Sequence, residues 1–352
     1  MQFEQLKWRS FLASLGGAVA WPVAGLSDRR VTVLCRAVAA VLLALAFLTL
    51  AHAQGSWPDR PIKFIVHVAA GGGVDMNARI LVDRLNQQLP HPVLIENQGG
   101  GGGVIAGRMV ANAAADGYTF LFAGPGHAAQ AFMHKQPPFD PIRDFIPVAL
   151  VTEFPLVVVI KPSLPARTLA EFIALLKAEP DKHTFGSSGV GGSSHIPAEM
   201  FVRQAGVSRI HVPFSGNGPS SAALIGGQID MIIDGLAPQL GNIADGRVRV
   251  LGVTTKSRTP FLPNVPAVSE TLPGYQFPMW VGLFAPAKTP KPIIDRLAAE
   301  VAKVMQDPLT RKRYLELSVE PRGSAPQEFD TFFREQLKFN EEIITSAKLQ
   351  QD

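Results

Sequence analysis

Short apolar runs alternate with amphipathic segments through most of the chain beyond residue 60. The apolar run at residues 62–68 predicts a strand, the triplet Gly71-Gly72-Gly73 predicts a turn, and residues 75–89 repeat apolar side chains at helical spacing. The apolar positions that share one face of this helix are Ala78, Leu81, Leu85 and Leu89. A strand, a glycine turn and a helix in this order are the building unit of α/β folds.

The same alternation continues to the C-terminus and predicts an α/β fold with mixed, mostly parallel sheets. Further strands are expected at residues 93–96, 119–123, 156–160, 184–186, 209–212, 231–234 and 248–254. Further helices are expected after the glycine run 99–103 and at residues 169–178, 194–205, 219–226, 290–306 and 326–344.

The 299 residues after position 53 are enough for two domains with sizeable cores, here called lobes. No linker of low complexity separates them, so we expect the chain to cross between the lobes more than once. We expect these crossings near residues 153–155 and 275–280. The predicted domains are a leader at residues 1–53, a first lobe made of residues 54–154 and 276–352, and a second lobe at residues 155–275.

The predicted leader contains an unbroken apolar run at residues 37–50, preceded by Arg29, Arg30 and Arg36 and followed by Ala51-His52-Ala53. A basic flank, a short apolar stretch and an A-x-A site are typical of a secretory signal peptide. The alternative is a membrane anchor, but a 14-residue helix spans about 21 Å, less than the roughly 30 Å hydrocarbon core. We therefore predict cleavage after Ala53 and export to the periplasm.

Removal of the leader changes the interpretation of the charge. The leader holds five basic and two acidic residues, so the formal net charge falls from +4 to about +1. This balance gives no reason to expect a nucleic-acid partner. The leader also contains Cys35, the single cysteine of the chain. The mature chain would therefore have no disulfide and no cysteine-based metal site.

Three glycine-rich loops, each between a predicted strand and a predicted helix, carry the main chemical signal. They span residues 69–75, 186–195 and 213–219. A glycine turn that opens a helix directs several backbone N–H groups at one point, with the positive end of the helix dipole behind them, and so attracts a carboxylate or a phosphate. None of the three loops contains lysine or arginine. We expect neutral dipoles, including serine hydroxyls, to hold the anion. The alternative is that these glycines only permit tight turns.

Several side chains allow two interpretations. Asp75 either occupies the first turn of a helix, where a carboxylate is favoured, or accepts a hydrogen bond from a ligand. Trp280, Phe154 and Phe214 are expected in the core or at a hinge, although one of them could cover the apolar side of a ligand. His195 is expected to pack on its loop at the start of a helix.

Other functional classes are less well supported. A serine hydrolase that uses Ser193 or Ser194 is the alternative, but no G-x-S-x-G elbow occurs there. The segment 101–106 matches the dinucleotide pattern G-x-G-x-x-A, yet such a match is nearly automatic within a run of five glycines. The histidines are scattered and form no H-E-x-x-H motif, so neither a metal site nor a cofactor is expected.

Many motifs in order resemble the Bug-type, TctC-like solute-binding proteins of tripartite tricarboxylate transporters. The resemblance covers residues 57–344. Its most specific pieces are Trp57-Pro58-Asp59-Arg60-Pro61-Ile62, Gly72-Gly73-Val74-Asp75, Asp116-Gly117-Tyr118-Thr119, Gly226-Gly227-Gln228-Ile229-Asp230 and Leu272-Pro273-Gly274-Tyr275.

The resemblance implies a two-lobed Venus-flytrap fold that binds a small carboxylate between the lobes. It places a first group of ligand-binding residues opposite a second group, with two further residues near the cleft. These are Ala70, Gly71, Gly72, Gly73 and Asp75, then Ser187, Gly189, Gly191 and Ser193, then Gly124 and Asp234. The family often has tyrosine where Phe214 stands and asparagine where Gly235 stands, and both differences remove polar groups.

We therefore predict a non-enzymatic, monomeric solute-binding protein that captures a small organic acid for uptake or sensing. Its partner would be a membrane permease or a sensor receptor.

Overall fold

The computed structural model describes residues 57–277, 279–347 and 349–350. The predicted leader and its cleavage site lie outside these residues. From Trp57 onward the chain forms one compact unit. Within the described part, no helix has both the length and the apolar character needed to cross a membrane.

The first sheet has six strands in the order β11-β4-β10-β3-β1-β2. Its strands are β1 (Ile62–Val66), β2 (Val93–Asn97), β3 (Thr119–Ala123), β4 (Phe145–Phe154), β10 (Met279–Pro286) and β11 (Glu320–Pro321). Strand β1 lies parallel to both β2 and β3, whereas β10 runs antiparallel to β3 and β4. The sheet is therefore mixed, with a parallel half near the N-terminal strands.

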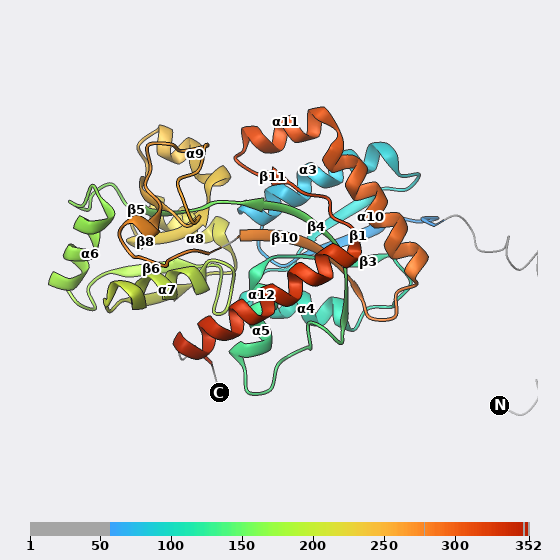
Figure 1. The fold of residues 1–352 in the computed structure, drawn as a ribbon, viewed down its shortest axis with the longest axis horizontal. Helices are drawn as coiled ribbons and strands as arrows, with labels where there is room; N and C mark the ends of the chain where they lie inside the picture. Colours follow the sequence, from blue (N-terminus) through green and yellow to red (C-terminus); the bar gives the residue numbers. More distant parts are fainter. Residues whose placement is uncertain (1–56, 278, 348, 351–352) are drawn as a thin grey trace, which may run out of the picture. The chain divides into compact units, whose positions relative to one another are not determined.

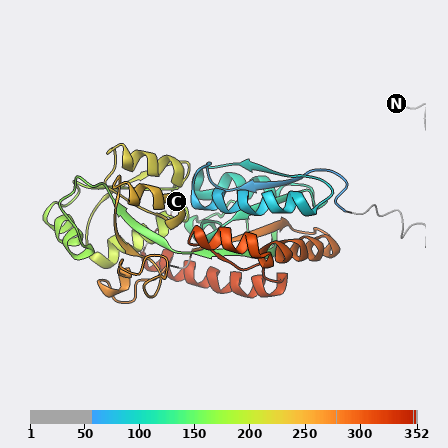
Figure 2. The ribbon, with the colours of Figure 1, turned by 90° about the horizontal axis from the view of Figure 1, so that it is seen from above.

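The second sheet has five strands in the order β7-β6-β8-β5-β9. Its strands are β5 (Leu156–Ile160), β6 (Thr184–Ser187), β7 (Ile210–Pro213), β8 (Met231–Gly235) and β9 (Arg249–Val253). Strand β6 is parallel to β7 and β8, while β5 is antiparallel to β8 and β9. Figures 1 and 2 show the two sheets side by side, with residues 156–253 in green to yellow.

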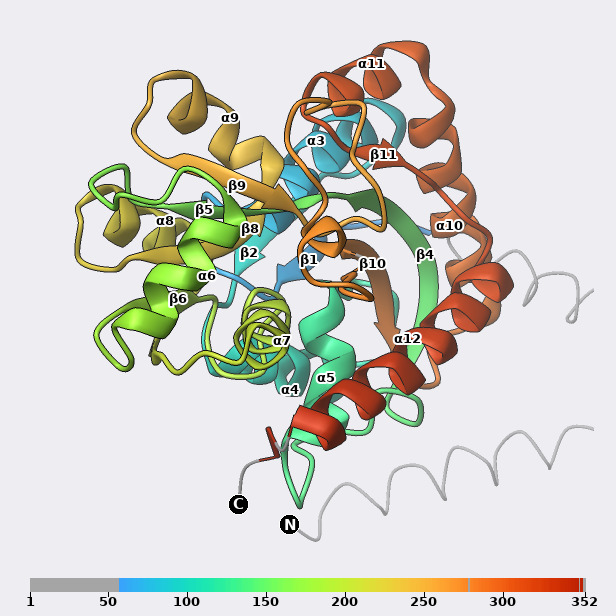
Figure 3. The ribbon, with the colours of Figure 1, turned by 60° about the vertical axis from the view of Figure 1, so that its left-hand side comes forward.

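Helices accompany both sheets. Those near the first sheet are α3 (Gly73–Gln88), α4 (Val104–Ala111), α5 (Pro125–Met133), α10 (Lys291–Gln306), α11 (Pro308–Glu316) and α12 (Pro326–Ala347), with the short helix η1 (Gly101–Gly103). Those near the second sheet are α6 (Leu169–Ala178), α7 (His195–Ala205), α8 (Asn217–Ile225) and α9 (Leu236–Ala244), with η2 (Val268–Glu270). Figure 3 shows α12 running past α5 towards α7. At the C-terminal end of α12, the Ser346 carbonyl accepts a hydrogen bond from the Arg203 guanidinium of α7 at 2.6 Å.

The chain passes from the first sheet to the second at Pro155, which stands alone between β4 and β5. It returns between the end of β9 at Val253 and the start of β10 at Met279. These two passages bring the ends of β4, β5 and β10 close to the loops that follow the parallel strands.

The predicted α/β class agrees with the structure, and the helix at residues 169–178 has the predicted bounds. The strands β4 and β10, the two longest of the first sheet, were not predicted from the sequence. Pro147 interrupts the apolar run of β4 and argues against a central strand. In the structure Pro147 lies opposite Phe284 at an irregularity of the β4–β10 pairing, where the loss of a backbone donor is tolerated.

Candidate functional site

Five helices each follow a strand that has a parallel neighbour, directly or after a short loop, so their N-termini lie near the carboxyl ends of these strands. These helices are α3 after β1, α5 after β3, α7 after β6, α8 after β7 and α9 after β8. Among the described residues, no side chain caps any of the five N-termini. The N-cap residues are Gly72, Gly124, Ser194, Gly216 and Gly235. An uncapped helix start favours a nearby anion through the positive end of its dipole. In α5, α7 and α9 a first-turn N–H is already donated to a loop oxygen: Gly126 to Ser193, His195 to Gly192 and Leu236 to Pro155.

An enclosed space lies where these helix starts meet, and we call it the glycine-loop cavity. Its lining comes from both sheets and their loops: Val68, Gly72, Gly73, Val74, Phe154, Leu156, Ser188, Ser193, Asn217, Gly235 and Met279. A water-sized sphere can occupy only about 10 Å³ of it, which is roughly the room that one water molecule needs. The loops are therefore nearly closed on each other.

Contacts between the loops of the two sheets maintain this closed arrangement. The backbone N–H of Ala69 donates to the Ser215 carbonyl at 3.3 Å. The N–H of Gly126 donates to the Ser193 hydroxyl oxygen at 3.1 Å. Gly102 has a φ of +63° and lies so close to the other loop that a Cβ would be 2.0 Å from the Val190 carbonyl oxygen. Only glycine fits there.

Asp75 stabilises the first glycine loop from behind. Its carboxylate accepts hydrogen bonds from the Gly71 N–H at 3.0 Å, the Arg79 guanidinium at 2.8 Å and the Asn97 amide at 2.9 Å. Burial alone would raise the pKa of this carboxyl, but these bonds and the Arg79 charge outweigh burial and hold the pKa below its usual value. These contacts support a structural role for Asp75 in the first turn of α3.

Asp234 lies behind the cavity on the opposite side and has a different environment. Its carboxylate accepts from the Asn217 amide at 2.6 Å, the Gly235 N–H at 2.7 Å and the Gln239 amide at 2.7 Å. These three donors are neutral. Burial raises the pKa of Asp234, and the three hydrogen bonds oppose this effect only in part.

Asp234 orients Asn217, which lines the cavity. With its amide nitrogen bound to Asp234, Asn217 presents its carbonyl oxygen to the Ser194 hydroxyl, 2.8 Å away. The Ser194 oxygen also accepts from the Ser188 N–H at 2.7 Å and lies 3.1 Å from the Ser188 hydroxyl oxygen. The serine loop and the start of α8 are thus joined in one polar network.

The residues predicted to bind the ligand take several positions. Gly72, Gly73 and Ser193 line the cavity. Asp75 and Asp234 lie behind it, and Gly124 lies beside it, where an added Cβ would be 3.5 Å from the Ser193 hydroxyl oxygen. Ala70 and Gly71 pack against Gly218, and Gly189 and Gly191 pack against Gly102 and Gln130. The remaining predicted residue is Ser187.

The Ser187 hydroxyl lies 2.6 Å from Nε2 of His211 and is not among the groups that line the cavity. Its neighbour Ser188 lines the cavity instead. Burial, and then the proximity of His195, lower the pKa of His211 to about 4. Ser187 and His211 resemble a nucleophile–base pair in distance only, since this pair lies outside the cavity.

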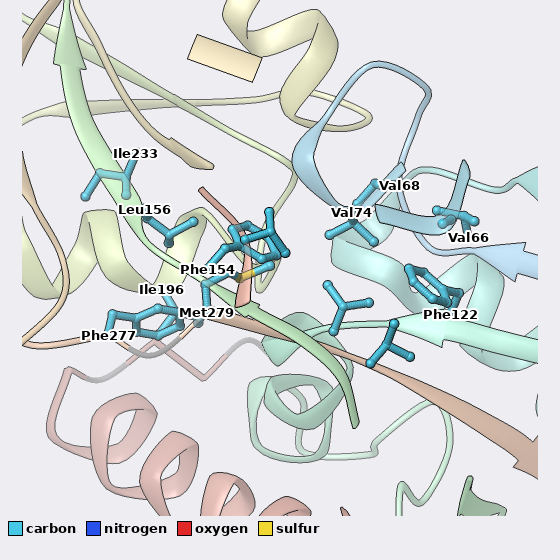
Figure 4. Packing of buried hydrophobic residues seen from close by; sticks show 14 of the residues in the cluster. Val66, Val68, Val74, Phe122, Phe154, Leu156, Ile196, Ile233, Phe277 and Met279 are labelled. Atoms are coloured by element: carbon cyan, nitrogen blue, oxygen red, sulfur yellow. The ribbon is translucent and has the colours of Figure 1, made fainter. Parts of the chain in front are cut away.

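The apolar part of the lining was not predicted as a unit. Figure 4 shows Phe154 and Met279 between Leu156 on one side and Val68 and Val74 on the other. Phe154 ends β4, Leu156 begins β5 and Met279 begins β10, so these residues come from the two passages between the sheets. Phe154 was predicted as a core or hinge residue, or as a cover for the apolar side of a ligand. Met279 was not predicted, because no strand was expected at β10.

Other chemistry has less support. Ser193 accepts from Gly126 and Ser194 bonds to Asn217, so the described residues show neither serine paired with a histidine. The described residues contain no cluster of three or more His, Cys, Asp or Glu side chains that could hold a metal ion. A wider hollow of about 670 Å³ lies between α12 and the segment after α5, and none of the predicted site residues lines it.

Two α/β sheets, with helix starts from both around one enclosed space, define a two-lobed periplasmic-binding-protein fold. The solved structure of the periplasmic binding protein BugD agrees with this assignment: its TM-score is 0.81 at 30% identity, over 84% of this chain and 100% of that one. The profile of the tripartite tricarboxylate transporter family receptor, TctC, matches residues 77–349. The chain belongs to this family of solute-binding proteins, which confirms the resemblance seen in the sequence.

Two further proteins show the extent of the similarity. A UPF0065 protein in the tcbD-tcbE intergenic region of Pseudomonas sp. strain P51 is 33% identical over 89% of this chain and 94% of its own length. The structure of MatC from Rhodopseudomonas palustris with bound malate has a TM-score of 0.79 at 32% identity, over 82% of this chain and 100% of that one.

Proposed function

We propose that this protein captures a small carboxylate in the glycine-loop cavity, between two lobes that close over it, and delivers it to a membrane transporter. The observation that carries the proposal is the meeting of uncapped helix starts from both sheets around one enclosed space. The family assignment and the malate-bound neighbour support the same conclusion.

The electrostatics of the cavity fit an anion held by neutral groups. The lining contains two serine hydroxyls and the amide of Asn217, next to the N-termini of α3, α8 and α9. Each helix start favours a nearby negative charge by about 0.3–1 kcal/mol, and by up to about 2 kcal/mol where it is partly buried. Several helix starts acting together can bind a carboxylate without an arginine or lysine.

We further propose that the lobes are residues 54–154 with 276–352, and residues 155–275, joined by the passages at Pro155 and before Met279. Phe154 and Met279 lie directly beside these passages. Opening and closing at these points would therefore move the apolar lining of the cavity together with the lobes. Because Ser193 and Ser194 bind loop groups rather than a histidine, we propose binding without catalysis. The predicted signal peptide supports a periplasmic location.

Thermal unfolding with a panel of carboxylates tests this proposal. A ligand at 100 times its dissociation constant adds about 2.7 kcal/mol of stability, which raises the melting temperature by roughly 5–10 °C. The variant Gly73→Val should abolish the rise, because a Cβ at this position is already 3.3 Å from the Phe154 ring. Gly241→Val is the matched control, since a Cβ there meets nothing within 4 Å.

The proposal fails if no carboxylate shifts the melting temperature of the wild type. It also fails if Gly73→Val keeps the full shift, because the ligand would then bind elsewhere. Turnover of an ester in the absence of any binding isotherm would favour the serine hydrolase.

A further inference from the structure

The glycine run at residues 99–103 connects β2 to α4 and is not among the predicted ligand-binding residues. Gly100, Gly101, Gly102 and Gly103 have φ angles of +117°, +56°, +63° and +104°. Residues with a Cβ are strained at these angles, whereas glycine is not. Four such angles in succession therefore account for the run of glycines in the sequence.

This conformation brings Gly102 against residues 186–195 of the other sheet, which we call the serine loop. An added Cβ at Gly102 would lie 2.0 Å from the Val190 carbonyl oxygen and 2.9 Å from the Gly192 nitrogen. In the reverse direction, an added Cβ at Gly189 would lie 3.0 Å from the Gly102 nitrogen. The glycine run and the serine loop therefore touch through their backbones.

Helix α5 supports this contact from the side of the first sheet. The fully buried amide of Gln130 donates to the Gly102 carbonyl at 3.2 Å. An added Cβ at Gly191 of the serine loop would lie 2.6 Å from the same amide nitrogen and 3.0 Å from the Met133 side chain. The glycine run and α5 thus form one surface against which the serine loop packs.

The contact lies beside the glycine-loop cavity, because neither Gly102 nor Val190 lines it. The serine loop carries Ser193, which does line the cavity and accepts the Gly126 N–H at 3.1 Å. A carbon and a carbonyl oxygen pack at about 3.3 Å or more, so Gly102→Ala would displace the Val190 carbonyl by at least about 1 Å. A shift of that size is enough to break the Gly126–Ser193 bond, since a distance of about 3.6 Å is no longer a hydrogen bond.

We propose that the glycine run is the surface on which the serine loop stops when the lobes close, and that Gly102 is a positioning residue for ligand capture. This inference rests on the proposed function and adds a further loop of the first lobe, which the ligand does not need to touch. Gly102 acts through Val190 and Ser193. It sets how near the serine loop comes to the start of α5, and so whether both lobes contact one carboxylate at the same time.

Titration calorimetry and small-angle X-ray scattering of Gly102→Ala test this inference, with malate, succinate, citrate and nicotinate as probes. We expect the variant to bind the best probe of the wild type at least tenfold more weakly, because contacts from one lobe only remain. The radius of gyration should fall when this probe saturates the wild type and stay unchanged when it saturates the variant. A glycine that served only the stability of its loop would leave this compaction intact in the folded variant.

Gly101→Ala is the matched control. Its φ of +56° imposes the same left-handed strain, but the nearest atom to an added Cβ belongs to Val104 of the adjoining helix, at 3.3 Å. This variant should bind and compact as the wild type does. Equal losses of affinity in the two variants, or wild-type affinity in Gly102→Ala, overturn the inference and leave the proposed function intact. Binding of none of the probes by the wild type overturns both.

A second pair of variants approaches the contact from the serine loop and decides the question if Gly102→Ala does not fold. Gly191→Ala, at a φ of +71°, places a methyl group against Gln130 and Met133 and should also weaken binding and compaction. Gly206→Ala has a φ of +62° at the end of α7 and meets nothing within 4 Å, so it should behave as the wild type does. Wild-type affinity and compaction in Gly191→Ala would contradict the inference.

Discussion

Asp75 of α3 and Asp234 of β8 lie behind the same cavity, one near each sheet, and their pKa values are shifted in opposite directions. Asp75 pairs with Arg79, which lowers its pKa, whereas the neutral partners of Asp234 leave it with a raised pKa. The first carboxylate holds a loop in place, and the second orients Asn217 towards the ligand side. Both carboxyls are almost inaccessible to solvent, but Asp234 is more deeply buried and has only neutral partners, so the same residue type serves two roles.

The strongest test of this comparison is Asp75→Asn. The substitution removes the ion pair with Arg79. It also replaces one carboxylate oxygen by an NH2 group, so at least one of the three donors, the N–H groups of Gly71, Arg79 and Asn97, meets another donor instead of an acceptor. We expect a loss of about 2–4 kcal/mol in the free energy of unfolding. Urea denaturation at pH 7 measures it. A loss below 1 kcal/mol would contradict the structural role of Asp75.

The pH dependence of stability separates the two carboxylates further. A lowered pKa means that Asp75 stabilises the fold above its unfolded pKa, and this contribution is lost as the pH falls through the folded pKa. The raised pKa of Asp234 has the opposite sign, because the folded state binds the proton more readily and stability increases as the pH falls towards the unfolded pKa. Asp75 therefore contributes to a loss of folding stability in acid, and Asp234 does not.

His127 of α5 also makes the folded protein less stable in acid. Neither of its ring nitrogens has a hydrogen-bond partner among the described residues. Burial, and then the proximity of His67, lower its pKa to about 3. The rings around it are those of Phe139, Phe145, Phe284 and Phe333, with centroids 5.0, 4.6, 4.8 and 5.9 Å away.

We expect His127→Leu to stabilise the protein, and more so in acid. Below pH 6.5 the unfolded chain takes up a proton that the folded His127 does not, so the wild type loses stability as the pH falls from 6.5 towards 3. The advantage of the variant should grow by about 2 kcal/mol between pH 7.5 and pH 5. Urea denaturation at both pH values measures this. An advantage that is equal at the two pH values would contradict the assigned pKa.

The smallest expected effect concerns Asp234→Asn. The amide keeps an oxygen for Asn217 and Gly235, while Gln239 can turn its own amide to match. Loss of the negative charge behind the cavity should tighten carboxylate binding by about 1 kcal/mol, or roughly fivefold. Titration calorimetry measures the affinity. Asp245→Asn, at the exposed end of α9 beside Arg247, is the control and should bind as the wild type does.

Parts of the site were predictable from local sequence. Strand, glycine turn and helix follow each other in three loops, and this order alone places uncapped helix starts at the ends of parallel strands. These loops contain Gly72, Gly73 and Ser193, which the family resemblance named as ligand-binding residues and which line the cavity. The side chains behind the loops were harder to assign, because Asp234 acts through Asn217 and Gln239, which local patterns do not connect.

The position of Ser187 shows where such prediction ends. Successive side chains of a strand point to opposite faces, so a shift of one residue decides whether Ser187 or Ser188 faces the ligand. The end of β6 is at Ser187, and the change from strand to loop turns Ser188 towards the cavity. The sequence around two adjacent serines does not indicate which of them does so.

The sequence by itself determined the α/β class, the family and the neutral, glycine-based chemistry of the loops, because these follow from short-range periodicity and backbone conformation. Only the tertiary structure decided the apolar lining of the cavity, where the ends of β4 and β10 bring Phe154 and Met279 together although 125 positions separate them. Strand pairing across such a distance depends on the packing of the whole sheet, and no local pattern specifies it.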